Sequence, residues 1–156
     1  MAVPLEYIYL IYTILLAVIL VVVVPKEKIR QLAVYAILFG ALTNIILIIM
    51  ATHLLDLGGH LNFMPFGVAG IPFFPPIAWT VYFIMFMYFL PEKKPWNFVF
   101  TLTASFYAVF FANVLVNIGL FYSNYGRFIV PLMIYGLWHF TVMWVYQRFF
   151  LHKSVY

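Results

Sequence analysis

His139 is the residue of this sequence with the clearest potential for chemistry, because it is the only histidine well inside a long apolar segment. An ionisable side chain at membrane depth is costly and marks a functional site by default. Asn44, Asn113 and Asn117 also lie in apolar segments. At about 1.5 Å of rise per residue, all four lie roughly 5–16 Å below the same end of a helical bundle. They could line a polar pocket, or hydrogen-bond one another across helices at about 0.6–2 kcal/mol per contact.

A second group of polar side chains, His53, Asp56 and His60, lies in the longest connection between apolar segments. Imidazole and carboxylate groups ligate divalent transition metals, so these residues are candidate metal ligands. Their spacing does not match an established metal-binding motif. Interfacial anchoring, contact with a quinone or lipid headgroup, and plain solvation remain the alternatives. We expect no bound metal and no cofactor. Haem held by two histidines is disfavoured, because only His139 lies well within an apolar segment.

The chain offers no recognisable catalytic arrangement. Ser105 and Ser123 are not part of the strand–turn–helix motif that activates a hydrolase serine, and the sequence contains no phosphate-binding glycine loop or acidic metal cluster. With no cysteine in the chain, disulfides, iron–sulfur clusters and a thiolate nucleophile are excluded. The sequence therefore favours a protein without enzymatic activity. An alternative is an enzyme acting on a lipid or isoprenoid, with His139 or the His53–Asp56 pair as the acid–base groups.

The amino-acid composition indicates that these side chains lie in a lipid bilayer. The 156 residues are 67% hydrophobic and only 8% charged, whereas soluble domains carry about 25% charged residues. A bilayer core about 30 Å thick requires roughly 20 apolar residues per helix. The sequence therefore predicts an all-α fold consisting of a single five-helix transmembrane domain over residues 1–156. The predicted spans are 5–24, 32–51, 71–90, 98–120 and 128–151.

The distribution of basic residues predicts the orientation of this bundle. Seven of them would lie on one side of the membrane, namely Lys26, Lys28, Arg30, Lys93, Lys94, Arg148 and Lys153, and only Arg127 on the other. Lysine and arginine concentrate in cytoplasmic loops. We therefore expect the N-terminus outside and the C-terminus in the cytoplasm, in a multi-pass protein of the cytoplasmic (plasma) membrane. Topology also accounts for the net charge of +4, so we expect no nucleic-acid partner.

Small and polar residues predict which helix faces meet, because lipid-embedded helices associate through small residues and polar contacts. Three stripes with four-residue spacing stand out. The richest lies in segment 98–120, which we therefore expect at the centre of the bundle. The stripes are Ala36, Gly40 and Asn44; Ala104, Ala108 and Ala112 with Thr101, Ser105, Asn113 and Asn117 beside them; and Tyr135, His139, Met143 and Gln147.

The connection 52–70 mixes apolar and polar residues and is a candidate lid. Gly58 is suited to end the second helix, and the prolines at 72, 75 and 76 indicate that the third regular helix begins near Pro76. Non-helical backbone at membrane depth must be covered by protein or line a water-filled cavity. We therefore expect residues 52–70 to cover a polar pocket.

These patterns favour a protein that binds or translocates a small or lipophilic solute. In this hypothesis Asn44, Asn113, Asn117 and His139 bind the solute, and Trp79 closes the site together with Phe73 and Phe74. The alternative is a non-catalytic accessory subunit of a larger membrane complex, since 22% of the residues are aromatic and suited to helix–helix contact. Expected partners are the lipid bilayer, a small-molecule or lipid ligand, and a membrane-protein partner or a second copy of the chain.

Overall fold

The computed structural model describes residues 3–150, of which 72% are helical. Within this part of the chain, four helices are long and apolar enough to cross a membrane, and they span Leu5–Val23, Lys26–Leu54, Trp96–Asn117 and Ile129–Phe149. A fifth apolar helix, Phe74–Phe89, has 16 residues. It extends about 24 Å, less than the roughly 30 Å of a bilayer core. The five helices correspond to the five predicted segments, and the four long ones have the length and composition of membrane-spanning helices.

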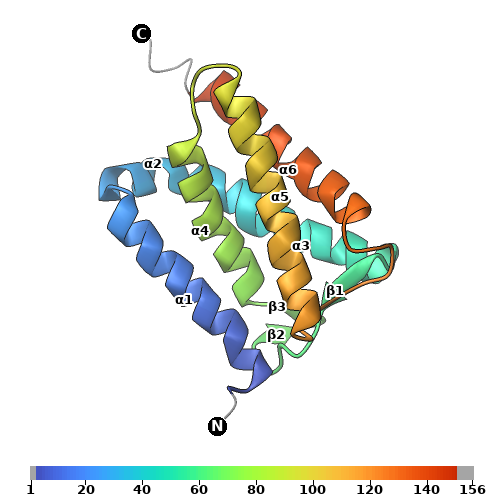
Figure 1. Ribbon diagram of the computed structural model, residues 1–156. Helices are drawn as coiled ribbons and strands as arrows, with labels where there is room; N and C mark the ends of the chain where they lie inside the picture. Colours follow the sequence, from blue (N-terminus) through green and yellow to red (C-terminus); the bar gives the residue numbers. More distant parts are fainter. Residues whose placement is uncertain (1–2, 151–156) are drawn as a thin grey trace.

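Figure 1 shows the order of the elements along the chain. The helices are α1 (Leu5–Val23), α2 (Lys26–Ala36), the π-helix η1 (Ile37–Leu42), α3 (Thr43–Ile48), the π-helix η2 (Ile49–Leu54), α4 (Phe74–Phe89), α5 (Trp96–Asn117) and α6 (Ile129–Phe149). Four short strands complete the fold: β1 (Gly58–His60), β2 (Gly67–Val68), β3 (Ile71–Pro72) and β4 (Phe121–Ser123). Strand β1 pairs antiparallel with β4, and β2 with β3. Because the strands cluster at one end of the bundle, we call it the cap end.

The second long helix begins at Lys26, six residues before the predicted boundary at residue 32. The carbonyl oxygen of Pro25 accepts hydrogen bonds from the amides of Lys28 and Ile29 at 2.9 and 3.0 Å. These bonds start the helix in a charged turn that an apolar-run criterion leaves out. Two wide turns, η1 and η2, interrupt the regular helix. Within η1, the carbonyl of Phe39 accepts a hydrogen bond from the Trp138 indole at 2.8 Å. Wide turns of this kind are frequent at functional sites.

The prediction that segment 98–120 lies at the centre of the bundle is wrong, because α4 occupies that position. Helix α4 packs against α1, α2, η1 and α3, whereas α5 packs mainly against α6 and β4. Apart from Thr80, the central part of α4 is apolar on every side, as in a helix with many packing neighbours, although Ile77 and Phe89 stay about half exposed. A Cβ on Gly40 would lie only 2.6 Å from the Cα and amide nitrogen of Thr80. The absence of a side chain at Gly40 therefore allows η1 and α4 to approach closely.

Helices α5 and α6 form an antiparallel pair joined by polar contacts. The amide of Asn97 donates to the Gln147 side-chain oxygen at 3.1 Å, and the Thr101 hydroxyl contacts the Met143 sulfur at 3.2 Å. Four members of the α5 stripe are buried and face inward: Thr101, Ser105, Ala108 and Ala112. Asn117, its last member, is exposed. These contacts make the pair a second layer beside the group formed by α1, α2, η1, α3 and α4.

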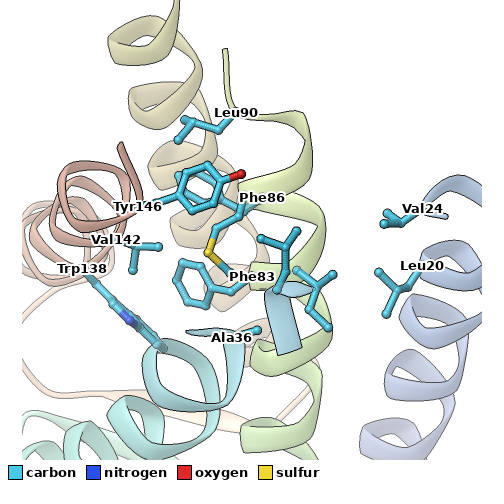
Figure 2. Close-up of a cluster of buried hydrophobic side chains, with 12 residues drawn as sticks. Leu20, Val24, Ala36, Phe83, Phe86, Leu90, Trp138, Val142 and Tyr146 are labelled. Atoms are coloured by element: carbon cyan, nitrogen blue, oxygen red, sulfur yellow. The ribbon is translucent and has the colours of Figure 1, made fainter. Parts of the chain in front are cut away.

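The largest hydrophobic cluster fills the half of the bundle opposite the cap end. Figure 2 shows Phe83 and Phe86 of α4 between Trp138 and Val142 of α6 on one side and Leu20 of α1 on the other. All five side chains are at most 6% exposed. Aromatic side chains dominate the energetics of such clusters because each buries a large area. This half is therefore tightly packed.

The same end of the bundle carries most of the charge. Residues 26–30 begin α2, Lys93 and Lys94 lie in the connection between α4 and α5, and Arg148 lies in the last turn of α6. We call this the basic end, and it lies opposite the strands (Figure 1). Arg127 lies between β4 and α6 at the cap end. Lys153 falls outside the described residues.

Residues 52–70 contain the strands β1 and β2, and β1 ties them to the connection between α5 and α6. The helix ends at Leu54, before Gly58, and α4 begins at Phe74, two residues earlier than expected. We call residues 55–73 together with 118–124 the cap. Besides the β1–β4 pairing, the amide of Leu61 donates to the carbonyl of Leu120 at 2.8 Å. The hydroxyl of the buried Tyr9 contacts the carbonyl oxygens of Leu61 and Leu120, and these contacts attach α1 to the cap.

Candidate functional site

A cavity of about 280 Å³ lies beneath the cap, between the two layers of the bundle. Its wall includes residues of α1, α3, η2, α4, α5, α6 and both strands β1 and β4. Small-molecule sites have volumes of roughly 300–1,000 Å³, so this one is suited to a small ligand. Four alanines contribute only a methyl group each to the wall and so leave room for this space: Ala51, Ala78, Ala108 and Ala112.

Two polar atoms of residues in the wall are buried without a hydrogen-bond partner among the described residues. They are Oδ1 of Asn44 and Nδ1 of His60. Asn44 lies on α3 and is only 5% exposed. Leaving a buried polar atom unsatisfied costs about 1–3 kcal/mol. Asn44 therefore holds an unsatisfied acceptor atom beside the cavity.

His60 belongs to β1 and lies in an aromatic environment under the cap. Its ring contacts Tyr9 and Phe121 edge to face, with centroid distances of 5.7 and 5.1 Å. Burial disfavours the charged imidazolium and lowers the pKa of His60 to about 4. The folded cap therefore contains a neutral histidine.

The depressed pKa of His60 makes cap stability dependent on pH. The unfolded cap binds a proton near pH 6.5, whereas the folded cap binds it only near pH 4. Stability is therefore full above about pH 6.5 and falls as the pH drops through this window. Between about pH 6 and pH 5, we expect roughly a tenfold increase in hydrogen exchange of the Leu61 amide, corrected for intrinsic rates. The variant His60→Gln should remove this increase, and an equal increase in that variant would contradict the assignment.

His139 is fully buried at the side of the cavity, behind Tyr82. Its Nδ1 lies 2.7 Å from the carbonyl oxygen of Tyr135, which can only accept, so Nδ1 carries the proton. In the neutral ring Nε2 then accepts from the Tyr82 hydroxyl at 2.9 Å. Tyr82 is part of the cavity wall, whereas His139 is not. His139 therefore fixes the orientation of a wall residue.

The remaining predicted site residues divide into two groups. Asn113 and Trp79 are in the cavity wall, as Asn44 is. The Asn113 amide donates to the carbonyls of Val109 and Arg127. Asn117 is exposed outside the cavity, and its Oδ1 accepts from the Arg127 guanidinium at 2.9 Å. The aromatic residues Phe73 and Phe74 do not line the cavity either.

The candidate metal ligands in the connection 52–70 are not brought together. Across residues 3–150 no group of three or more histidine, aspartate or glutamate residues could hold a metal ion. His53 is exposed at the end of η2, and Asp56 is an exposed turn residue with φ +47°. Only His60 of this group faces the cavity.

The comparisons with known proteins give no relative for this chain. No family model matches it, and neither a curated protein nor a solved structure is significantly similar to it. Its function must therefore be inferred from the geometry of the cavity.

Sequence reasoning missed several residues of the wall, including Tyr12, Tyr82 and Thr52. Their hydroxyl groups lie in apolar or aromatic stretches, where membrane anchoring and core packing are the common roles. The helical spacing from Trp79 to Tyr82 was the one available signal, since residues three apart share a helix face.

The wall of the cavity also reaches the apolar surface of the bundle. Leu15 and Ile19 of α1 and Tyr107 of α5 line the cavity, yet they are 57%, 49% and 62% exposed. The two helices are not closely packed at this level, although Tyr12 and Phe111 make an edge-to-face contact nearer the cap. The side of the bundle between α1 and α5 therefore provides an apolar route into the cavity.

Proposed function

We propose that the chain crosses the cytoplasmic membrane five times, with the cap outside and the basic end in the cytoplasm. The grouping of Lys26, Lys28, Arg30, Lys93 and Lys94 at one end supports this orientation, because basic loops are retained in the cytoplasm. Helix α4 serves as a short fifth span. The β2–β3 pair before it covers the remaining membrane depth at the outer side.

Within this topology we propose that the protein binds or translocates a small, neutral, lipophilic solute through the cavity. The observation that carries the proposal is an apolar cavity beneath the cap with the unpaired Asn44 oxygen in its wall. Among the described residues, Arg127 is the one formally charged residue of the wall, and no carboxylate of residues 3–150 lines it. Because an unpaired charge is expensive in such surroundings, the site is unsuited to a cationic solute.

Intrinsic fluorescence offers a direct test in lipid nanodiscs. Of the four tryptophans, Trp79 and Trp138 line the cavity, whereas Trp96 and Trp144 are exposed. A parent protein with Trp96→Phe and Trp144→Phe therefore reports on the cavity. Bromodecanol quenches tryptophan through its heavy atom, and binding in the cavity should add a saturable component to the linear quenching caused by bromodecanol in the bilayer.

Filling the cavity should abolish this saturable component. Ala112 is a buried wall residue of α5, and Ala112→Phe places a ring in the space that the solute needs. We expect the apparent affinity for bromodecanol to fall about tenfold or more, the equivalent of about 1.4 kcal/mol. Val114→Phe is the matched control, because Val114 lies on the same helix but faces outward and does not line the cavity. Equal saturable quenching in both variants would exclude the cavity as the site.

A further inference from the structure

We propose that the cavity selects an uncharged lipophilic molecule with a hydrogen-bond donor in its head group, an alcohol being the simplest case. The head group donates to Oδ1 of Asn44, and the apolar chain extends toward the opening between α1 and α5. This inference rests on the proposed function and adds the chemical class of the ligand.

The first argument comes from the hydrogen bonds of the wall. Tyr82 donates to His139, Asn113 to the carbonyls of Val109 and Arg127, and Thr52 to the carbonyl of Gly58 at 2.9 Å. The donor groups of these three side chains are satisfied within the protein. Among the described residues, Oδ1 of Asn44 is a buried oxygen of a wall residue without a partner, and it can only accept a hydrogen bond. A ligand that satisfies it must therefore bring a donor.

The position of Asn44 supports its role as the deep contact. Asn44 lies one helical turn from Gly40, where η1 and α4 are in closest approach, so packed backbone lies behind it. Thr52, under the cap, lies eight residues further along the same helix, which corresponds to roughly 12 Å. A head group at Asn44 therefore lies deep in the bundle, well away from the aqueous side of the cap.

The charges in the cavity wall limit which head groups the ligand can carry. An ammonium head group would meet no carboxylate in the wall, and an ionised carboxylic acid has no proton to donate. Arg127, the one cationic wall residue, lies at the cap end and binds Asn117. A neutral hydroxyl satisfies Asn44 without introducing a buried charge.

The shape of the cavity fits a molecule with one chain. The small volume leaves room for a slim body, and the exposed wall residues Leu15, Ile19 and Tyr107 mark where it meets surrounding lipid. An alkyl chain that leaves between α1 and α5 stays in apolar surroundings along its whole length.

A matched pair of probes tests this assignment in the nanodisc assay. Bromodecanol carries the donor, and bromodecyl methyl ether has the same chain without it. In the parent protein we expect the ether to bind roughly tenfold more weakly, because it leaves Asn44 unsatisfied. In Asn44→Leu the two probes should bind with equal affinity. Val114→Phe should keep the parent's preference for the alcohol.

The outcomes separate this inference from the proposed function. If neither probe gives saturable quenching in the parent, the proposed function fails. If both bind the parent with equal affinity, the cavity binds solutes but the donor requirement is wrong. A preference for the alcohol that persists in Asn44→Leu would overturn the assignment to Asn44 and transfer it to His60, the other unpaired group.

Discussion

Gly40→Ala should destabilise the protein by about 1–3 kcal/mol, the typical cost of overpacking a filled interior. The added Cβ would lie 2.6 Å from the Thr80 Cα and amide nitrogen and 2.8 Å from the Trp79 carbonyl carbon. These are backbone atoms of the central helix α4, so no side-chain rotation can relieve the contact. Thermal unfolding in nanodiscs, followed by near-UV circular dichroism, would measure the loss.

Gly136→Ala is the matched control for this prediction. Gly136 lies within α6, and a Cβ there would meet no atom within 4 Å. Alanine favours the helix over glycine by about 0.8–1.0 kcal/mol, so this variant should be as stable as the parent or slightly more so. Equal effects of the two substitutions would show that the close approach of η1 and α4 does not limit packing.

The second large effect concerns the pair formed by Tyr82 and His139. Tyr82→Phe leaves Nε2 of the buried His139 without a donor and should cost about 1–3 kcal/mol. His139→Leu removes the acceptor of the Tyr82 hydroxyl and should cost a similar amount. The double variant should be destabilised by less than the sum, with a coupling of about 0.5–3 kcal/mol between the two residues.

Denaturation of the four proteins in the same nanodiscs would give this coupling. Tyr107→Phe is the control, because Tyr107 is also in the cavity wall but is 62% exposed. Its effect should stay within about 0.5 kcal/mol. Additive effects of Tyr82→Phe and His139→Leu would mean that the hydrogen bond does not position Tyr82.

Much of the architecture follows from hydropathy and from small-residue spacing. The apolar runs predicted the five helices, and the burial of Ala36, Gly40 and Asn44 confirms the stripe of the second one. The position of α4 was missed because its apolar surface shows no directional pattern. A stripe shows which face of a helix packs, but it does not show how many neighbours that helix has.

Hydropathy and small-residue spacing did not predict the cap or the wide turns, and the physical reason is a different one. Strand β1 pairs with β4 from a segment about 60 residues away, and this pairing is formed by backbone groups. Side-chain patterns carry little information about it. The same holds for the carbonyl of Phe39, whose bond to the Trp138 indole depends on how two distant helices meet.

The sequence predicted where the cavity lies, but it predicted only some of the residues that line it. Asn44 and Asn113 were chosen by depth and Trp79 as an aromatic residue that closes the site, and all three line the cavity. Depth alone could not show that Tyr82 separates His139 from the cavity. The direction in which His139 points depends on the rotation of α6 about its axis. The participation of Asn44, Asn113, Asn117, Trp79 and His139 in ligand binding stays a prediction.

The β1–β4 pairing also sets the order in which the molecule can be completed during biogenesis. Synthesis proceeds from the N-terminus, so α1 to α4 and residues 58–60 are made well before Phe121–Ser123 exist to pair with them. Until then the cavity lacks the β1–β4 pair that covers it and the part of its wall that α5 and α6 contribute. The compartment beneath the cap is therefore among the last parts of the molecule to be assembled.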